Sequence, residues 1–441
     1  MNNDVTRRDF VKTATAATAV AATLPAWATP EVRSGVKVGL IGCGGRGTGA
    51  AGQALTASPS VTMWSMGDAF SDRLKSSAKN LEDHAGDRAV VPEERRFVGF
   101  DAFQQVIDSG VDMVILTTPP HFRPQHLRAA VDAKKHVFCE KPMAVDGTGV
   151  RSVLASAEIA KAAGTNLVAG FCWRYNAPER AAYQRIHDGA VGDVRSVYTT
   201  YLASPLNPQP RKEGWSDMEA QMRNWQHLAW LSGDHIVEQA CHSIDKINWA
   251  MNGRTPLRAT AVGGRGLREG EERGDIFDHF GVVFEYDDGI RCHHLCRQVA
   301  NCDFENNDYI VGSTGTCTIN GWAPTHRIDG QNAWEYDGPK TNMYQVEHDE
   351  LQEAIRGDRA TINNGEWMAQ STMMAILARE SAYAGRTLAW DDVLNSDMRL
   401  GPREYAFGDL AIPEPAVPGI TTLERSWPEP AALGITTLEQ S

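Results

Sequence analysis

Short apolar runs that end in glycine, proline or a charged residue recur along the first third of the chain. Runs of this length, rich in β-branched residues, are typical of strands buried on both faces of a parallel sheet. The predicted strands are Val36–Ile41, Val61–Met66, Val111–Thr117, His136–Cys139 and Asn166–Gly170. The stretches between them predict helices over Thr48–Ala57, Asp101–Asp108, Gln125–Ala133 and Gly149–Ala163. Strands that alternate with helices predict an α/β fold, with a doubly wound parallel (Rossmann) sheet over residues 34–171.

The pattern changes after Tyr175, where longer runs are separated by turn signals such as Asp287-Asp288-Gly289. Neighbouring runs that are joined by short turns predict hairpins, and hairpins pair in the antiparallel direction. The predicted strands are Val194–Leu202, Arg258–Gly263, Phe277–Tyr286, Ile290–Gln298 and Cys317–Ile319. We therefore expect residues 172–390 to form a second, substrate-binding α+β domain with an open antiparallel sheet.

The N-terminus has the pattern of a targeting segment. Thr6-Arg7-Arg8-Asp9-Phe10-Val11-Lys12 precedes a mild Ala/Thr/Val stretch, and Ala26-Trp27-Ala28 places small residues at the cleavage positions. Paired arginines followed by Phe and Lys resemble a twin-arginine export signal. We expect residues 1–28 to be removed and the folded protein to be exported to the periplasm or another extracytoplasmic space.

The C-terminal arm, residues 391–441, contains a duplication. Glu414–Glu424 recurs as Glu429–Glu439 with only two changes. Two copies are too few for a solenoid. Two interpretations remain open: a tandem duplication in an extended arm, or an arm that packs on a neighbouring subunit.

Composition and charge narrow the possible partners. The 441 residues are 42% hydrophobic and 22% charged, which is ordinary for two globular domains. The net charge of −13 argues against nucleic acid and anionic membrane surfaces as partners. No apolar run approaches the roughly 20 residues that span a bilayer, so we expect no membrane insertion of the mature protein.

A metal site is suggested by Cys292-His293-His294-Leu295-Cys296, but the run is strand-like. In a strand, Cys292, His294 and Cys296 would share one face and His293 would take the other. We therefore expect no metal.

A phosphate-binding turn follows the first predicted strand. In Gly42-x-Gly44-x-x-Gly47, Gly42 allows a tight turn, Gly44 lets the backbone approach a pyrophosphate, and Gly47 lets helix and strand pack closely. Asp68 ends the second predicted strand, where a carboxylate can bind both ribose hydroxyls and repel a 2′-phosphate. NAD is therefore expected, with NADP possible. The residues expected to contact the cofactor are Gly42, Gly44, Gly45, Arg46, Gly47, Asp68, Thr117, Pro119, His121, Glu140 and Lys141.

Lys141 lies in the run His136-Val137-Phe138-Cys139-Glu140-Lys141-Pro142-Met143. The strand stops at Pro142 and carries Glu140 and Lys141 to its carboxyl end, where the nicotinamide of a bound cofactor would lie. An ammonium group there would stabilise a developing alkoxide, and burial is expected to lower its pKa. This position predicts redox chemistry.

These residues, with Gly170-Phe171-x-Trp173-Arg174-Tyr175-Asn176 and Glu238-Gln239-Ala240-Cys241-His242-Ser243-Ile244-Asp245, resemble a known enzyme family. It is the glucose–fructose oxidoreductase / inositol dehydrogenase / rhizopine-catabolism (Gfo/Idh/MocA) family of NAD(P)-dependent enzymes, and the likeness covers roughly residues 34–390. The resemblance implies that Lys141, Glu238 and His242 are the catalytic set. The family usually has Asp and Gly where this chain has Glu238 and Ala240. The longer arm of Glu238 leaves open whether it only orients its neighbours or itself transfers a proton.

The residue types fit that assignment. If residues 238–245 are helical, Glu238 and His242 lie on one face. A histidine with a pKa near 6.5 suits removal of the hydroxyl proton that must accompany hydride transfer. The candidate substrate-binding residues are Arg174, Tyr175, Asp245 and Trp225. Each has an alternative role: packing for the first two, orientation of His242 for the third, and a place in the hydrophobic core for the last.

Export and a dinucleotide site constrain each other, because no pool of free dinucleotide is expected outside the cytoplasm. We expect the cofactor to stay bound and to be reset within each cycle on a small carbohydrate substrate. In one chemistry a sugar is oxidised and a second carbonyl compound is then reduced. In the other, a redox-neutral glycosidase oxidises the sugar transiently, eliminates its substituent, adds water and returns the hydride. A non-catalytic dinucleotide-binding sensor is the third alternative. A homo-oligomer through the open sheet face is also expected.

Overall fold

A six-stranded parallel sheet occupies the first part of the chain, in the order β3-β2-β1-β4-β5-β6. The computed structural model describes residues 35–322 and 325–424. The strands are β1 (Val36–Ile41), β2 (Val61–Asp68), β3 (Arg96–Val98), β4 (Met113–Leu116), β5 (His136–Glu140) and β6 (Leu167–Gly170). The helices between them are α2 (Gly45–Ala57), α3 (Ser71–Ala85), α4 (Ala102–Asp108), α5 (Arg123–Asp132) and α6 (Gly147–Ala163). The strand order reverses between β1 and β4, the point where such sheets bind ligands at their carboxyl ends.

The predicted Rossmann sheet is confirmed, and two of its elements went unpredicted. The core strands can be predicted from continuous apolar runs in the sequence, because strands such as β4 and β6 are buried at every position. Helix α3 is mostly polar, with Leu74, Ala78 and Leu81 as its buried apolar residues. Strand β3 has three residues and begins with Arg96, which is too short to show a period.

A nine-stranded, mostly antiparallel sheet forms the second half of the chain, in the order β14-β13-β12-β11-β7-β10-β9-β8-β15. Among the described strand pairs of this sheet, only β7 and β10 run parallel to each other. Its strands are β7 (Val194–Ala203), β8 (Arg258–Gly264), β9 (His279–Glu285), β10 (Arg291–Gln298), β11 (Asn307–Gly312), β12 (Gly315–Asn320), β13 (His326–Gly330), β14 (Trp334–Glu335) and β15 (Leu388–Ala389). The predicted alternation along β10 is confirmed, because Cys292, His294 and Cys296 are buried and His293 is not. Across the described ranges, no three His, Cys, Asp or Glu side chains are grouped to hold a metal ion.

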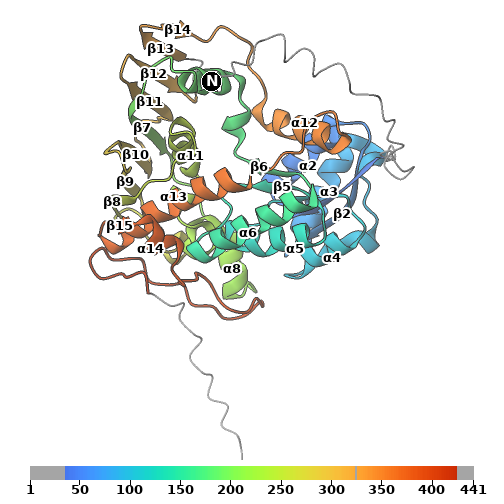
Figure 1. The fold of residues 1–441 in the computed structure, drawn as a ribbon. Helices are drawn as coiled ribbons and strands as arrows, with labels where there is room; N and C mark the ends of the chain where they lie inside the picture. The colour runs from blue at the N-terminus through green and yellow to red at the C-terminus, as the bar shows by residue number, and fades with distance from the viewer. Residues whose placement is uncertain (1–34, 323–324, 425–441) are drawn as a thin grey trace, which may run out of the picture. The chain divides into compact units, whose positions relative to one another are not determined.

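Two helices that follow β14 pack on the parallel-sheet region, and the second of them also contacts the nine-stranded sheet (Figure 1). Helix α13 (Gly365–Ala384) contacts both α6 and β8, and is buried along almost its whole length. Helix α12 (Met343–Arg356) packs on α2, and its Leu351 belongs to the same core as β1 and β2. The chain therefore returns to the nucleotide-binding sheet after β14, before β15 adds the last strand of the second sheet.

The first copy of the duplicated segment packs on its own chain. The backbone N–H of Gly419 donates to the carbonyl of Ala384 at the end of α13, at 3.0 Å. Ala416 and Leu423 also pack against the main core. The second copy and the predicted export signal lie outside the described residues. No helix within the described ranges is long and apolar enough to cross a membrane.

Candidate active site

The glycine turn between β1 and α2 is packed on one side and open on the other. A Cβ at Gly42, whose φ is +97°, would lie 2.7 Å from the backbone N of Thr118, and one at Gly47 would lie 2.0 Å from the carbonyl O of Gly42. A Cβ at Gly44 or Gly45 would meet no atom within 4 Å. Helix α2 begins here, and Gly44 at its N-cap has no side chain to satisfy the first N–H groups. Those groups are therefore free to bind an anion.

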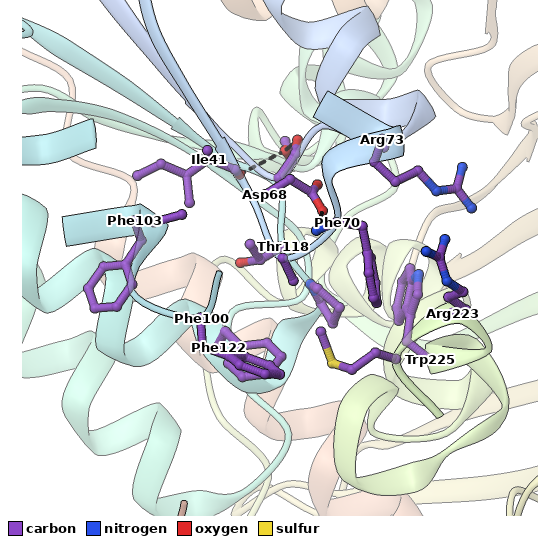
Figure 2. A pocket seen from close by; sticks show the side chains of 18 of the residues that line it. Ile41, Asp68, Phe70, Arg73, Phe100, Phe103, Thr118, Phe122, Arg223 and Trp225 are labelled. Carbon is purple, nitrogen blue, oxygen red and sulfur yellow. Dashed lines mark hydrogen bonds between the residues drawn. The ribbon is translucent and has the colours of Figure 1, made fainter. Parts of the chain in front are cut away.

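A cavity of about 250 Å³ opens beside this turn, at the carboxyl ends of β1, β2 and β4 (Figure 2). Of the residues expected to contact the cofactor, those that line it are Gly42, Gly44, Gly45, Asp68, Thr117 and Pro119. Its opposite side comes from a distant part of the chain that includes Met222, Arg223 and Trp225. Figure 2 shows Arg223 and Trp225 next to Phe70 and Arg73 of the parallel-sheet region.

Asp68 supports the turn and also faces the cavity. Its Oδ1 accepts the N–H of Phe70 at 2.9 Å, and its Oδ2 accepts the N–H of Cys43 at 2.6 Å. Each carboxylate oxygen keeps a second lone pair for an incoming hydroxyl. Burial raises the pKa of Asp68, and these two hydrogen bonds oppose the rise. Arg73 and Arg223 are two cations that line the same cavity. Arg223 Nη2 forms an ion pair with Asp72 Oδ1 at 3.1 Å.

Five of the residues expected at the cofactor do not line this cavity: Arg46, Gly47, His121, Glu140 and Lys141. Arg46 pairs with Glu140, and with the fully buried Glu347 of α12 at 3.3 Å. These ion pairs tie the glycine turn to the end of β5 and to α12. His121 Nε2 lies 2.7 Å from the hydroxyl of Tyr405 in the C-terminal arm, and burial lowers the pKa of His121 to about 3. His121 is therefore neutral and packed against the C-terminal arm.

Lys141 and Glu238 meet across the two halves of the chain. Lys141 Nζ donates to the backbone carbonyl of Glu238 and lies 3.4 Å from Glu238 Oε1. Residues 238–245 do not form one continuous helix: α10 (His235–Glu238) ends there and α11 (Cys241–Ala250) begins after a break. In a continuous helix the Glu238 carbonyl would accept the N–H of His242, which instead donates to Gln239. Because of the break, the Glu238 carbonyl can accept the hydrogen bond from Lys141 Nζ.

The expected fall in the pKa of Lys141 is also wrong. Burial does lower this pKa, but the attraction of Glu238, with help from other nearby acidic groups, outweighs burial and raises it above its ordinary value. Lys141 is therefore a cation at neutral pH. An ammonium group has three donors, and two of those of Lys141 are directed at Glu238. The third is left for a substrate oxygen.

His242 lies in the second position of α11, half-buried, with its ring 5.9 Å from that of Phe171. Its Nδ1 is buried without a hydrogen-bond partner among the described residues. Burial, followed by the charges of Lys141 and Lys246, lowers its pKa well below the ordinary value. The imidazole is therefore neutral and able to accept a proton. None of Lys141, Glu238 and His242 lines the 250 Å³ cavity.

The contacts of Arg174 and Tyr175 favour the alternative of packing, and hydrogen bonds join Asp245 to Arg174 and Ser371. Arg174 Nε and Nη2 each donate to a carboxylate oxygen of Asp245 at 2.9 Å, and Ser371 donates to the same carboxylate at 2.7 Å. The hydroxyl of buried Tyr175 donates to Asn364 at 3.0 Å. The fourth candidate, Trp225, lines the cofactor cavity.

Tyr201 is a site residue that the sequence did not reveal. It lies near the end of β7, and burial raises its pKa to about 12, with Lys141 lowering and Glu238 raising that value. It is therefore near enough to Lys141 and Glu238 to be affected by their charges. In the sequence it was one aromatic among several in a predicted strand. Phe70, Arg73 and Arg223 were missed because neither α3 nor the segment around Arg223 was assigned to the cofactor region.

Residues 36–171 match a family model described as an oxidoreductase family with an NAD-binding Rossmann fold. Residues 180–318 match the model of the GFO/IDH/MocA C-terminal domain. The two matches together cover more than half of the chain.

Two curated relatives and two solved structures are similar to this chain. An uncharacterized oxidoreductase of Streptococcus pneumoniae serotype 4 is 24% identical over 78% of this chain and 87% of its own length. The 2,7-anhydro-N-acetylneuraminate hydratase of Escherichia coli K12 is 24% identical over 45% of this chain and 49% of its own. The aldose–aldose oxidoreductase of Caulobacter crescentus, solved with glycerol, has a TM-score of 0.64 at 21% identity, and covers 80% of this chain and 99% of its own. Levoglucosan dehydrogenase, solved with NADH and levoglucosan, has a TM-score of 0.64 at 19% identity with the same coverage.

Proposed function

Because the chain belongs to the Gfo/Idh/MocA family of oxidoreductases and has its NAD-binding Rossmann domain, we propose that it oxidises a hydroxyl of a sugar, polyol or glycoside. The observation that carries the proposal is the position of Lys141. Its ammonium stands at the carboxyl end of β5, held by Glu238, with one donor left for a substrate oxygen. This arrangement suits a hydroxyl that becomes a carbonyl.

The residues of the cavity fit a dinucleotide. The open backbone at Gly44 and Gly45 and the N-terminus of α2 would hold the pyrophosphate, and Asp68 would accept hydrogen bonds from the ribose hydroxyls. Phe70 and Trp225 line the same part of the cavity and would enclose the adenine ring. When bound, the nicotinamide supplies the acceptance and the return of a hydride.

The catalytic roles follow from the protonation states. Lys141, a cation, stabilises negative charge on the reacting oxygen. Neutral His242 accepts the hydroxyl proton. Glu238 holds Lys141 in place and keeps it charged, so we assign it an orienting role.

We propose further that the protein is exported and keeps its cofactor bound. Two features support this. The sequence pattern of residues 1–28 fits twin-arginine export of a folded protein. The cavity is lined by residues from both halves of the chain, and its wall residue Phe100 is backed by Tyr405 and Phe407 of the C-terminal arm, with ring centroids 5.9 and 5.0 Å away.

The redox-neutral route is the second candidate. The match to a hydratase supports it, because that relative's name denotes addition of water rather than net oxidation. Lys141, His242 and Tyr201 supply the acid and base groups that elimination and hydration require. The sensor alternative fits less well, because the chain keeps both Lys141 and His242.

One preparation tests these proposals together. The mature protein is purified from the extracytoplasmic fraction, a sample is extracted with acid for NAD(H), and the rest is screened against sugars and glycosides. Bound-nicotinamide absorbance and released aglycone are recorded in parallel. We expect stoichiometric NAD(H) and a substrate-dependent absorbance change. Released aglycone without net reduction would assign the redox-neutral route. Protein confined to the cytoplasm would contradict export, and protein free of NAD(H) would contradict retention.

Asp68→Ser is expected to weaken NAD binding about 10- to 100-fold, because a hydrogen bond to a charged group contributes about 1.5–3 kcal/mol. Affinity for NADP should fall less or rise, since Arg73 and Arg223 remain to face a 2′-phosphate. Titration of the cofactor-stripped protein with each dinucleotide measures both constants. Asp83→Ser, on the exposed side of α3, is the control. Equal losses for NAD and NADP would show that Asp68 only supports the turn.

Trp225→Ala is expected to speed the release of NADH about 10-fold or more, because stacking of a base on an aromatic ring is worth about 1–3 kcal/mol. Displacement of bound NADH by excess NAD, followed by fluorescence, gives the rate. Trp334→Ala, on β14 at the far edge of the other sheet, is the matched control. An unchanged release rate in Trp225→Ala would show that Trp225 does not help to retain the cofactor.

A further inference from the structure

Three aromatic side chains form a row at one end of the nine-stranded sheet. The ring centroids of Tyr201 and Trp322 lie 5.9 Å apart at 74°, and those of Trp322 and Phe304 lie 6.4 Å apart at 64°. Tyr201 is half-buried, whereas Trp322 is 48% exposed and Phe304 is 64% exposed. We call these three residues the aromatic row. It begins at the catalytic side of the sheet and ends in solvent.

Strand order explains why these distant residues meet. Strands β12, β11 and β7 are neighbours, and β11 is antiparallel to both of the others. The ends of β7 and β12 therefore lie beside the start of β11. Tyr201 is near the end of β7, Trp322 follows β12, and Phe304 precedes β11. A backbone pairing between Leu202 and Glu305, with an N–O distance of 2.7 Å, fixes the start of the row.

The row is continuous with the proposed active site. Ser243, next to His242, donates its hydroxyl to the carbonyl of Thr200, next to Tyr201, at 2.9 Å. Gln239, next to Glu238, accepts a hydrogen bond at 2.7 Å from Gln298, which lies at the end of the strand beside β7. Both ends of the break between α10 and α11 are thus fastened to the sheet at the point where the row starts.

Tyr201, the less exposed end of the row, is on the covered face of the sheet. Along β7 the buried positions Val197 and Thr199 alternate in step with Tyr201, so Tyr201 belongs to the face that contacts α11. The opposite face carries exposed Leu295 and Val262, and that is where a second copy of the chain would pair. The position of the row therefore argues for a ligand of the active site rather than for a subunit contact.

We propose that the aromatic row is a subsite for a second ring, so that the substrate is a glycoside whose aglycone or next sugar unit stacks on Trp322. This proposal rests on the proposed function and specifies its substrate class. Aromatic faces bind the apolar C–H face of a sugar ring or a flat aglycone, and they do so without ordering a flexible side chain. A single sugar ring at Lys141 would give Trp322 and Phe304 no role in binding the substrate.

Binding by the holoenzyme tests the subsite separately from turnover. Paired phenyl and methyl β-glycosides of glucose, galactose and N-acetylglucosamine are titrated calorimetrically into the full-length mature protein. We expect the phenyl member of at least one pair to bind about 10-fold more tightly than the methyl member. Trp322→Ala and Phe304→Ala should remove this preference while leaving the methyl glycoside's affinity unchanged. Trp334→Ala, an aromatic truncation elsewhere on the sheet, should keep it.

Each outcome decides the question. No phenyl preference in any pair, or a preference that survives in Trp322→Ala, overturns the subsite. Equal losses for phenyl and methyl glycosides in Trp322→Ala also overturn it, because they indicate general damage to the site. A lower assembly mass of Trp322→Ala with an unchanged preference would identify a subunit contact instead. Binding with the expected preference but without turnover would leave the subsite standing and count against the proposed oxidation.

Discussion

A Lys141→Met variant is expected to lower kcat about 10³-fold or more, because it removes both a charge that stabilises the reacting oxygen and a group able to move a proton. Methionine keeps the length and apolar stem of lysine, so the local packing is preserved. NADH affinity should stay close to that of the wild type, since Lys141 does not line the cavity beside the glycine turn. Steady-state turnover and NADH fluorescence titration on the same preparation measure the two effects.

The matched control is Lys161→Met, an exposed lysine in the last turn of α6. It removes the same charge from the same type of side chain at a distance from the site, and should leave kcat unchanged. Lys141→Arg keeps a cation but replaces a compact ammonium by a planar fork, and is not expected to restore activity. A Lys141→Met enzyme with near wild-type kcat would contradict the role given to Lys141 in every version of the mechanism.

The elements that position the cofactor site could be predicted from the sequence, because each is formed by residues that are close together along the chain. The turn at Gly42–Gly47 follows a buried apolar strand directly, and Asp68 ends the next one, so the elements and their order are enough to place these groups at one edge. The same logic placed Lys141 at the end of β5. Such predictions succeed because a parallel sheet leaves little freedom in where its strands end.

The rest could not be predicted because it depends on contacts between distant segments. Glu347 reaches Arg46 across 301 residues, and nothing in the pattern around Glu347 indicates a buried ion pair. Trp225 looked like a core or sugar-binding residue, yet folding brings it to the dinucleotide cavity. The predicted direction of the Lys141 pKa shift was wrong, because the strand pattern indicated that Lys141 is buried but did not indicate its contact with Glu238.

The break between α10 and α11 shows how tertiary structure overrides local pattern. Spacing of four residues between Glu238 and His242 is helical, and a helix over 238–245 would have placed both side chains on one face. In the structure the Glu238 carbonyl instead accepts a hydrogen bond from Lys141, and Gln239 accepts one from Gln298. Glu238 contacts Lys141, and His242 is near enough for the charge of Lys141 to lower its pKa, but the two residues come from two elements rather than one.

Glu238→Gln is expected to lower kcat about 10- to 100-fold at neutral pH and to add an alkaline limb to the pH–rate profile. Glutamine keeps the shape of the side chain and the backbone carbonyl that binds Lys141, but removes the charge that raises the pKa of Lys141. Burial then acts with less opposition, and the pKa of Lys141 falls. As the pH rises through that lowered pKa, Lys141 loses its proton and the rate declines. In the wild type the raised pKa keeps Lys141 charged over the same range.

Profiles of kcat/KM between about pH 6 and 10 compare the variant with the wild type, and Glu238→Asp serves as the charge-retaining control. Asp keeps the carboxylate on a shorter arm, so it should retain more activity than Gln and show no new limb. Glu366→Gln, at the exposed start of α13, controls for loss of a negative charge. A uniform loss of about 10³-fold at every pH in Glu238→Gln, without a new limb, would show that Glu238 itself transfers the proton, because such catalysis contributes about 10²- to 10⁴-fold. The shape of the profile, more than the size of the loss, therefore separates a residue that orients Lys141 from one that takes part in the proton transfer.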